Sequence, residues 1–407
     1  MTSEWEIVSL GDYCEIKNGY AFKSKDFSTS GVPVIKIKNV KPNQIVESDF
    51  SYIPEDIALE KDKWIIRKGD ILLTMTGNRA DGSPESWVGK AAIFTLDGKY
   101  LLNQRVASIR SKSIELDTEY LGYFLSSWES QLYFIKHSNS SGGQANISPD
   151  IVRQYLIPLP PLAVQKRMVS VLKVIDEMIS ANQQINDNLQ QQAELLYHER
   201  FETADRSNLP VGWRIVRLGD VATISKKSFN PAKEPEMLLE HYSIPAFDEA
   251  HFPVFELSTA IKSNKFVVDN TCFMISKLNP TTKRVWKPYC LTENAVCSTE
   301  FIVYKANRQE ITDFLYSVID SSSFSDFMCS HVTGSTGSRQ RTTPSDTLAF
   351  ELILPTAEEI AEYQGIVSPI FEQIKCNAIE NDELKRLRDS LLPKLMSGEI
   401  DASGIQL

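Results

Sequence analysis

The sequence lacks the residue spacings that mark metal and redox sites. None of its six cysteines and five histidines forms a CxxC pair, a zinc-type Cys/His spacing or an HExxH motif. We therefore predict no metal site, and we expect free, buried thiols. The cysteines are Cys14, Cys272, Cys290, Cys297, Cys329 and Cys376, and the histidines, to which no chemistry is assigned, are His137, His198, His241, His251 and His331.

Long apolar runs are also missing. No stretch of about 18 apolar residues occurs, and the opening MTSEWEIVSL has no basic stretch followed by an apolar run and a cleavage site. The 407 residues, 42% of them hydrophobic, exceed what one core usually holds, since single cores rarely grow beyond about 250 residues. We expect a cytoplasmic protein of two or three packed domains with no membrane partner.

The chain has none of the motifs by which many enzymes bind phosphates or flipped bases. There is no Gly-x-x-x-x-Gly-Lys-Ser/Thr loop and no Asn-Pro-Pro-Tyr motif. Asn279-Pro280 is followed by threonines, and the glycines at 142–143 and 334–337 lack the spacing of a phosphate cradle. These absences predict no catalytic residue and no cofactor in this chain.

What the sequence does contain is an internal repeat. Residues 5–12, WEIVSLGD, return as residues 213–220, WRIVRLGD, with six of eight positions identical at an offset of 208. A second correspondence, at an offset of 195, relates Gly142, Pro149 and Pro160 to Gly337, Pro344 and Pro355. A repeat of this length indicates two similar structural units.

Each half has the same order of expected elements. Residues 34–38 and 301–304 have the β-branched and apolar character of strands, and Gly69-Asp70 precedes a buried strand at 71–73. Helical stretches are expected over 118–134 and 309–328, each followed by a Gly/Ser-rich loop. The pattern predicts two α+β modules.

A long helical segment follows each module, and its heptad seam repeats at the offset of 195. The first seam comprises Leu172, Ile175, Ile179, Asn182, Asn186, Leu189, Ala193 and Leu196. The second comprises Val367, Ile370, Ile374, Asn377, Asn381, Leu384, Arg388 and Leu391. Paired asparagines at both centres indicate that the two helices pack on each other, because a seam asparagine needs a partner amide and then fixes register.

We expect these helices to pack antiparallel as a coiled coil, with the asparagines of one opposite those of the other. In the alternative, each helix packs on its own module and the asparagines face water. About 36 helical residues span roughly 54 Å, which would place the modules at opposite ends of a rod. The expected division is 1–161 and 205–355 for the modules, and 162–204 and 356–407 for the helical regions.

Two similar modules related by a pseudo-two-fold axis match the two-fold symmetry of duplex DNA. The rod is comparable to, or somewhat longer than, a DNA turn of about 34–36 Å, so each module could reach its own major-groove segment. The architecture therefore predicts bipartite DNA reading, with the rod setting the gap between the two halves.

Several motifs resemble one known family over nearly the whole chain. They are the Trp-x-Ile-Val-x-Leu-Gly-Asp opening of each half, Gly-Asp-Ile-Leu-Leu at 69–73, Leu-Pro-Pro-Leu-x-x-Gln at 159–165 and Leu-Leu-Pro-Lys-Leu-Met-Ser-Gly-Glu-Ile at 391–400. In order and spacing they resemble the specificity subunit of type I restriction-modification enzymes. The second half departs from the pattern at 354–357, where Leu-Pro-Thr-Ala replaces Leu-Pro-Pro-Leu.

The resemblance implies a fold and a set of partners. Two target-recognition domains would each read one half of a split site on double-stranded DNA, and the helical regions would bind two methyltransferase subunits and, through them, restriction subunits. S-adenosylmethionine and ATP would belong to those partners, so this chain would be a non-catalytic specificity subunit.

The charge of the chain is unusual for a DNA reader. The net charge is −10, of which the segments 1–161 and 205–355 carry −2 and −1. Such near-neutral modules have little non-specific affinity for phosphates, so we expect the isolated chain to bind DNA poorly and its partners to supply much of the phosphate contact.

Candidate base-reading residues lie in local polar clusters, because Arg and Lys suit guanine, and Asn and Gln suit adenine. They are Thr76, Asn78, Arg79, Gln144, Asn146, Lys277, Lys283, Arg284, Lys287, Arg339, Gln340 and Arg341. For each, a solvated loop residue is the alternative. For the whole chain, the alternatives are a non-DNA adaptor with two protein-binding modules on a coiled-coil spacer, and an enzyme whose site is assembled from scattered residues.

Overall fold

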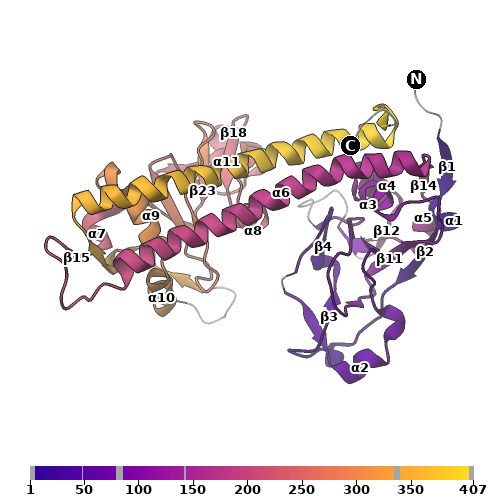
Figure 1. Ribbon diagram of the computed structural model, residues 1–407, viewed down its shortest axis with the longest axis horizontal. Helices are drawn as coiled ribbons and strands as arrows, with labels where there is room; N and C mark the ends of the chain where they lie inside the picture. The colour runs from indigo at the N-terminus through magenta and orange to yellow at the C-terminus, as the bar shows by residue number, and fades with distance from the viewer. Residues whose placement is uncertain (1–4, 48, 79–85, 142–143, 334–339, 403–407) are drawn as a thin grey trace. The chain divides into compact units, whose positions relative to one another are not determined.

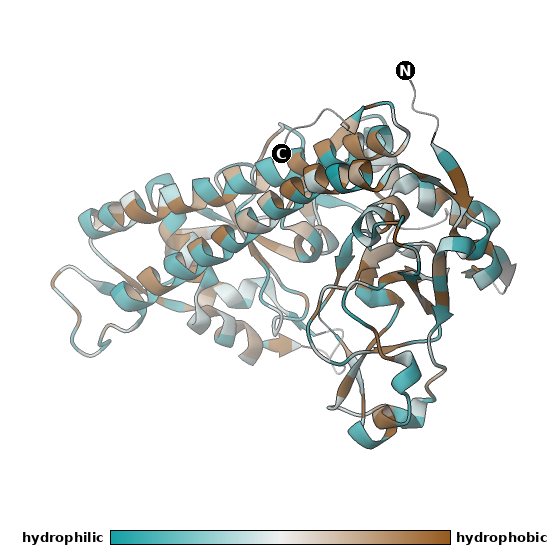
Figure 2. Ribbon diagram, turned by 45° about the vertical axis from the view of Figure 1, so that its right-hand side comes forward, coloured by the Kyte–Doolittle hydropathy of each residue, from teal (hydrophilic) through white to brown (hydrophobic). Residues whose placement is uncertain are grey.

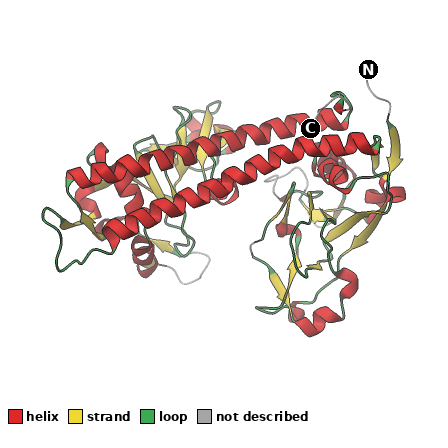
Figure 3. Cartoon of the chain, in the orientation of Figure 1, coloured by secondary structure: helices red, strands yellow, loops and turns green. Residues whose placement is uncertain are grey.

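The computed structural model describes residues 5–47, 49–78, 86–141, 144–333 and 340–402. They form two compact units, Met1–Glu177 with Leu384–Leu407, and Met178–Glu383. Each unit combines helices with small sheets (Figure 3), so the predicted α+β class is confirmed. Each unit takes up part of both long helices, and the division at residues 161 and 355 stays a prediction.

The first unit is built around an antiparallel sheet with the strand order β2 (Cys14–Asn18), β11 (Val106–Ser111), β7 and β9 (Ala91–Ile93). Its strand β7 (Ile71–Thr74) is buried at every position. Ile71 and Leu73 pack into one hydrophobic core and Leu72 into another, because successive side chains of a strand point to opposite faces. Burial on both faces explains why this strand is an unbroken apolar run after the turn at Gly69-Asp70.

The other strands and helices of the first unit surround this sheet. They are β1 (Glu6–Ser9), α1 (Leu10–Tyr13), β2 (Cys14–Asn18), β3 (Val32–Ile35), β4 (Val40–Lys41), β5 (Gln44–Ile45), β6 (Ser51–Ile53), α2 (Glu55–Leu59), β8 (Thr76–Gly77), β9 (Ala91–Ile93), β10 (Leu101–Leu102), β11 (Val106–Ser111), α3 (Thr118–Ser126), α4 (Trp128–His137), β12 (Asn139–Ser141), β13 (Gln144–Asn146), α5 (Pro149–Arg153) and β14 (Leu156–Leu159).

The second unit repeats the plan around the sheet β16-β24-β21-β22 and adds the five-stranded sheet β17-β20-β23-β18-β19. Its elements are β15 (Arg214–Arg217), α7 (Leu218–Val221), β16 (Ala222–Ser225), β17 (Ser228–Phe229), β18 (Leu238–Tyr242), α8 (Ile244–Ala250), β19 (Val254–Leu257), β20 (Lys265–Val267), β21 (Cys272–Ser276), β22 (Val285–Trp286), β23 (Ala295–Ser298), β24 (Phe301–Ala306), α9 (Thr312–Asp320), α10 (Ser322–Ser330), β25 (Val332–Thr333), β26 (Arg341–Thr342) and β27 (Glu351–Leu354).

The two repeat offsets, 208 and 195, relate the two strands of one pair in the first unit to the two strands of the equivalent pair in the second. In the first unit β1 pairs antiparallel with β14, with Glu6 opposite Leu159. In the second, β15 pairs with β27, with Arg214 opposite Leu354. Glu6 and Arg214 differ by 208 positions, and Leu159 and Leu354 by 195. The repeat seen in the sequence is therefore a repeat of tertiary structure.

The predicted helices at 118–134 and 309–328 are each two helices. The break falls at Ser127 between α3 and α4, and at Ser321 between α9 and α10. Each serine has an extended backbone, and its side chain accepts a hydrogen bond from the backbone N–H three residues later. Serine favours this N-cap geometry over a helix interior, and the apolar periodicity on both sides concealed it.

The strand expected over 34–38 is shorter than predicted. β3 ends at Ile35, and Ile37–Asn39 form a 3-10 turn. The side chain of Asn39 accepts a hydrogen bond from the backbone N–H of Lys36 and closes this turn. A local side-chain bond thus ends the strand.

The long helices are α6 (Leu162–Tyr197), which continues into a π-helix at His198–Glu202, and α11 (Ala357–Met396). Their hydrophobic residues recur at intervals between hydrophilic ones (Figure 2), as in helices that bury one stripe. No described helix is both long and apolar enough to cross a membrane.

Within the second unit the two helices run antiparallel (Figure 1). The side-chain amide of Asn377 donates to Asn186 over 2.8 Å, and that of Asn182 donates to Asn381 over 3.1 Å. Asn377 and Asn381 are buried, so these paired amides satisfy each other inside the seam.

Within the first unit the seam continues with an ion pair. Arg388 of α11 contacts Asp176 of α6 over 2.8 Å, and the hydroxyl of Tyr123 donates to the other oxygen of Asp176. All sixteen residues of the two predicted seams are buried or half-buried. The predicted antiparallel pairing of the two helices is confirmed.

Candidate nucleic-acid interface

In the first unit, three of the predicted base-reading residues lie on one small sheet, β12-β13-β8. Asn146 of β13 lies opposite Thr76 of β8, and the Thr76 hydroxyl donates to the Asn146 side-chain oxygen over 3.0 Å. Gln144, at the other end of β13, is exposed. The strand pairing thus brings together polar side chains that are about 70 residues apart in the sequence.

Asn78 directly follows β8, and its backbone bonds the side of the strand opposite to β13. It forms an isolated bridge with Trp87, and its side-chain amide donates to the Ser86 hydroxyl over 3.0 Å. The ring of Trp87 in turn lies 5.6 Å from that of Trp128, which is half exposed. Arg79, the cation predicted beside Asn78, lies outside the described residues.

The second unit has an equivalent edge, formed by β26 and the residues that follow β21. Arg341 of β26 bridges Leu278, and the backbone N–H of Asn279 donates to the carbonyl of Gln340 over 2.9 Å. Gln340 and Arg341 therefore lie beside the segment that begins at Lys277, as Asn146 lies beside Thr76 in the first unit. Arg339 lies outside the described residues.

Most of the predicted cations of the second unit have a carboxylate partner. Arg284 forms a bidentate pair with Asp248, and Arg341 forms one with Glu300 at 3.0 and 3.1 Å. Lys287 pairs with Asp313 over 2.6 Å. Sequence reasoning missed these carboxylates because each lies 26 to 41 positions from its cation, with only the fold to join them.

Lys283 joins helix α6 to the body of the second unit. It pairs with Asp320 at the end of α9 and with Glu194 of α6. Asp320 is buried, and its burial raises the pKa of its carboxyl, while the charge of Lys283 opposes this shift. These contacts make Lys283 a structural anchor between α6 and α9. Its contact to DNA stays a prediction.

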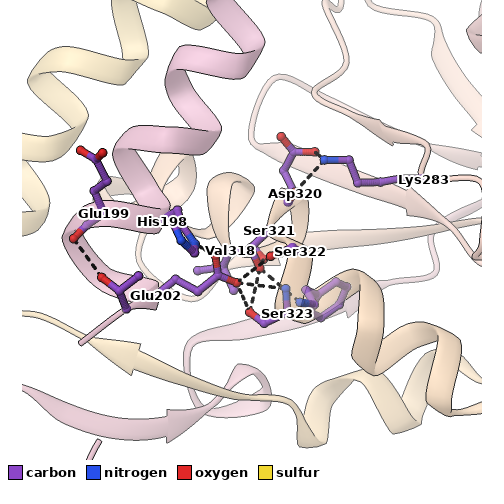
Figure 4. Close-up of polar contacts among 11 residues, drawn as sticks. His198, Glu199, Glu202, Lys283, Val318, Asp320, Ser321, Ser322 and Ser323 are labelled. Atoms are coloured by element: carbon purple, nitrogen blue, oxygen red, sulfur yellow. Dashed lines mark hydrogen bonds and ion pairs between the residues drawn. The ribbon is translucent and has the colours of Figure 1, made fainter. Parts of the chain in front are cut away.

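A second polar contact holds the π-helix that follows α6 against the start of α10 (Figure 4). Glu202, in the π-helix, accepts hydrogen bonds from the backbone N–H and the hydroxyl of Ser323 at the start of α10, and it also contacts His198 over 2.8 Å. Burial opposes ionisation of Glu202, but these hydrogen bonds outweigh it and lower its pKa. An ionised carboxylate at a helix N-terminus is well placed, because the N–H groups there lack partners.

Lys277 differs from these cations. Within the part of the chain that the structure describes, it makes no ion pair, and it is half-buried beside Arg341. Among the same described residues, no group of three or more His, Cys, Asp or Glu side chains could hold a metal ion. Instead of a metal site, the described residues of the two similar edges offer hydrogen-bond donors and acceptors.

Known proteins share both the domain and the overall plan. Residues 2–191 match the family described as the type I restriction modification DNA specificity domain. The specificity subunit of the type I restriction enzyme MjaVIII from Methanocaldococcus jannaschii is 30% identical over 190 residues, which cover 46% of this chain and 43% of that protein. The putative MjaX specificity subunit of the same organism is 24% identical and covers 98% of this chain and 94% of its own length.

A solved structure shows the same fold. The S subunit of the type I restriction-modification system from M. genitalium superposes with a TM-score of 0.54 at 14% identity, covering 97% of this chain and 96% of that one. Its likeness extends over both units. The family match and the related specificity subunits confirm the resemblance inferred from the sequence motifs.

Proposed function

We propose that this chain, in which residues 2–191 belong to the family of type I restriction modification DNA specificity domains, is the DNA-reading subunit of such a complex. Each unit reads one half of a bipartite site on double-stranded DNA, and the antiparallel helices set the gap. The chain itself is non-catalytic and works in the cytoplasm.

The observation that carries this proposal is the structural repeat. Both units place polar side chains on an equivalent edge: Thr76 and Asn146 in one, and Arg341, which lies opposite Leu278, in the other. Two similar edges on one chain suit two separate segments of a duplex. Asn and Gln at one edge and Lys, Gln and Arg at the other are the residue types that recognise base edges in the major groove.

The partners follow from the same proposal. Two methyltransferase subunits dock on the helical regions, and restriction subunits join through them. S-adenosylmethionine and ATP are bound by these partners and supply the chemistry, while this chain selects where it occurs.

The test is to co-express the chain with a candidate methyltransferase subunit from the same genome and to map methylated adenines across the host genome by single-molecule sequencing. We expect a split motif of two short specified halves around a fixed gap. Expression of the methyltransferase alone is the control. If no complex and no new methylation appear, the proposal fails and a protein-binding adaptor becomes the better description.

Within that experiment, Arg341→Ala should relax only one half of the motif, because Arg341 lies on the edge of the second unit. Arg79→Ala should relax only the other half. Loss of both halves from either change would contradict the assignment of one reader to each unit.

A further inference from the structure

The turn between β10 and β11 of the first unit, Asn103-Gln104-Arg105, lies against the edge that carries Thr76 and Asn146. The backbone N–H of Met75 donates to the carbonyl of Arg105, and that of Ile147 donates to the carbonyl of Met75, both over 2.9 Å. The turn at Arg105 and the segment at Asn146 therefore follow each other along the same side of the strand that enters β8, and residues 86–90 bond its other side.

The second unit has the same three segments in the same register. The N–H of Lys277 donates to the carbonyl of Glu300, and that of Thr342 donates to the carbonyl of Lys277. Arg105 and Glu300 differ by 195 positions, as do Asn146 and Arg341. Position 105 thus corresponds to Glu300, and position 146 to Arg341.

This equivalence shows that side chains at the two positions can reach each other. In the second unit, Glu300 and Arg341 follow each other along one side of the strand that contains Lys277, and they meet there in a bidentate pair. In the first unit, the equivalent backbone carries a guanidinium at 105 and an amide at 146. The side chains of Arg105 and Asn146 can therefore occupy one small patch.

The side chain of Arg105 is available to a ligand. It is exposed, and among the residues that the structure describes it has no ion pair or side-chain hydrogen bond. The side-chain oxygen of Asn103 accepts a hydrogen bond from the Arg105 N–H, which orders the turn. The backbone of Gly19 also packs closely on it, since a Cβ there would lie 2.2 Å from the carbonyl oxygen of Asn103.

We propose that Arg105 reads a guanine in the half-site bound by the first unit, beside the base read by Asn146, and that Glu300 positions Arg341 in the second unit. A guanidinium bonds the O6 and N7 atoms of guanine through two donors, and a side-chain amide does the same with adenine. The half-site of the first unit would then combine a guanine and an adenine. This inference rests on the proposed function and adds to it a residue pair for each half.

The test uses the complete complex with its methyltransferase and compares Arg105→Ala with Arg67→Ala. Arg67 is an exposed arginine of the same unit, but it precedes β7 whereas Thr76 follows that strand. We expect Arg105→Ala to lower discrimination at one guanine of one half by about tenfold or more, with the other half and the gap unchanged. Arg67→Ala should keep the motif of the unaltered complex.

Three further variants keep the result decisive. Glu300→Gln and Arg341→Ala should relax the same base position, in the half that Arg105→Ala leaves intact, because Glu300 acts through Arg341. If Arg105→Ala does not assemble with the methyltransferase, Arg105→Gln replaces it, and the same guanine should lose its preference.

The outcomes separate this inference from the function on which it rests. A split motif that stays unchanged in the Arg105 variants, with the same methylated fraction, overturns the inference alone. Absence of any split motif from the unaltered complex overturns the proposed function and this inference with it.

Discussion

At the scale of single residues, two helical glycines have opposite surroundings. A Cβ at Gly122 of α3 would lie 2.3 Å from Cγ1 of Ile93 in β9, whereas a Cβ at Gly365 of α11 would meet nothing within 4 Å. Helix α3 can therefore approach the sheet only because position 122 has no side chain. At position 365, glycine makes no such packing contact and only lowers helix propensity.

Alanine at these two positions should act in opposite directions. We expect Gly122→Ala to lower the free energy of unfolding by about 1–3 kcal/mol through overpacking. Gly365→Ala should raise it by up to about 1 kcal/mol, because alanine is the better helix former. Denaturant unfolding of the purified chain measures both, and a loss of stability in Gly365→Ala would contradict the open surroundings of that site.

Asp269 makes the stability of the second unit depend on pH. Burial opposes ionisation of this carboxyl, but the ammonium of Lys305, 2.5 Å away, and hydrogen bonds from Thr271 outweigh it and lower its pKa to about 2. A carboxyl whose pKa is lower in the folded state stabilises the fold above its unfolded pKa of about 4, and this contribution is lost as the pH falls.

The matching variant is Asp269→Asn, which removes the charge and keeps the shape. The difference in unfolding free energy between the unaltered chain and Asp269→Asn should be constant above about pH 4 and should disappear as the pH approaches about 2. Thermal unfolding across this range measures the difference. A gap that persists unchanged to the lowest pH would show that Asp269 contributes through contacts other than its charge.

At the scale of elements, the seam of α6 and α11 depends on its central asparagines. Asn186 accepts from the amide of Asn377 and donates to the carbonyl of Ile374. Asn186→Leu would leave the buried amide of Asn377 without this acceptor, at a cost of about 1–3 kcal/mol.

Replacing both partners should behave differently. Asn186→Leu with Asn377→Leu removes the unpaired amide, so stability should recover, but the helices lose the contact that fixes their register. Light scattering should then show more than one oligomeric species. Asn188→Leu is the control, since Asn188 is exposed on the same helix and should shift stability by less than about 0.5 kcal/mol. A double variant as unstable as the single one would contradict this account.

Local sequence patterns allowed some elements to be predicted. Caps within a continuous apolar pattern and contacts between residues far apart in the sequence could not be predicted in this way. The seam was predictable because its heptads are local, and the repeat because Trp5 to Asp12 and Trp213 to Asp220 share six identities. The caps at Ser127 and Ser321 were hidden, since apolar periodicity continues across both. The partners of Arg284 and Arg341 lie 36 and 41 positions away, so only the folded chain brings them together.

At the scale of the whole molecule, net charge limits what the chain can do alone. A charge of −10 disfavours phosphate contact, and the ion pairs of Arg284, Lys287 and Arg341 neutralise part of the positive charge near the second edge. Base contacts specify a sequence, but phosphate contacts supply most of the general affinity for DNA. A reader built in this way needs partners that supply the missing positive charge.

The isolated chain should therefore bind a duplex containing its own motif much more weakly than the complex with methyltransferase subunits does. Its affinity should also depend less on salt, because each phosphate contact contributes about −0.9 to the slope of log affinity against log salt concentration. Fluorescence anisotropy between about 50 and 200 mM salt measures both quantities, with a scrambled duplex as the control. Tight, strongly salt-dependent binding by the chain alone would mean that its own lysines and arginines supply the phosphate contacts, despite its charge of −10.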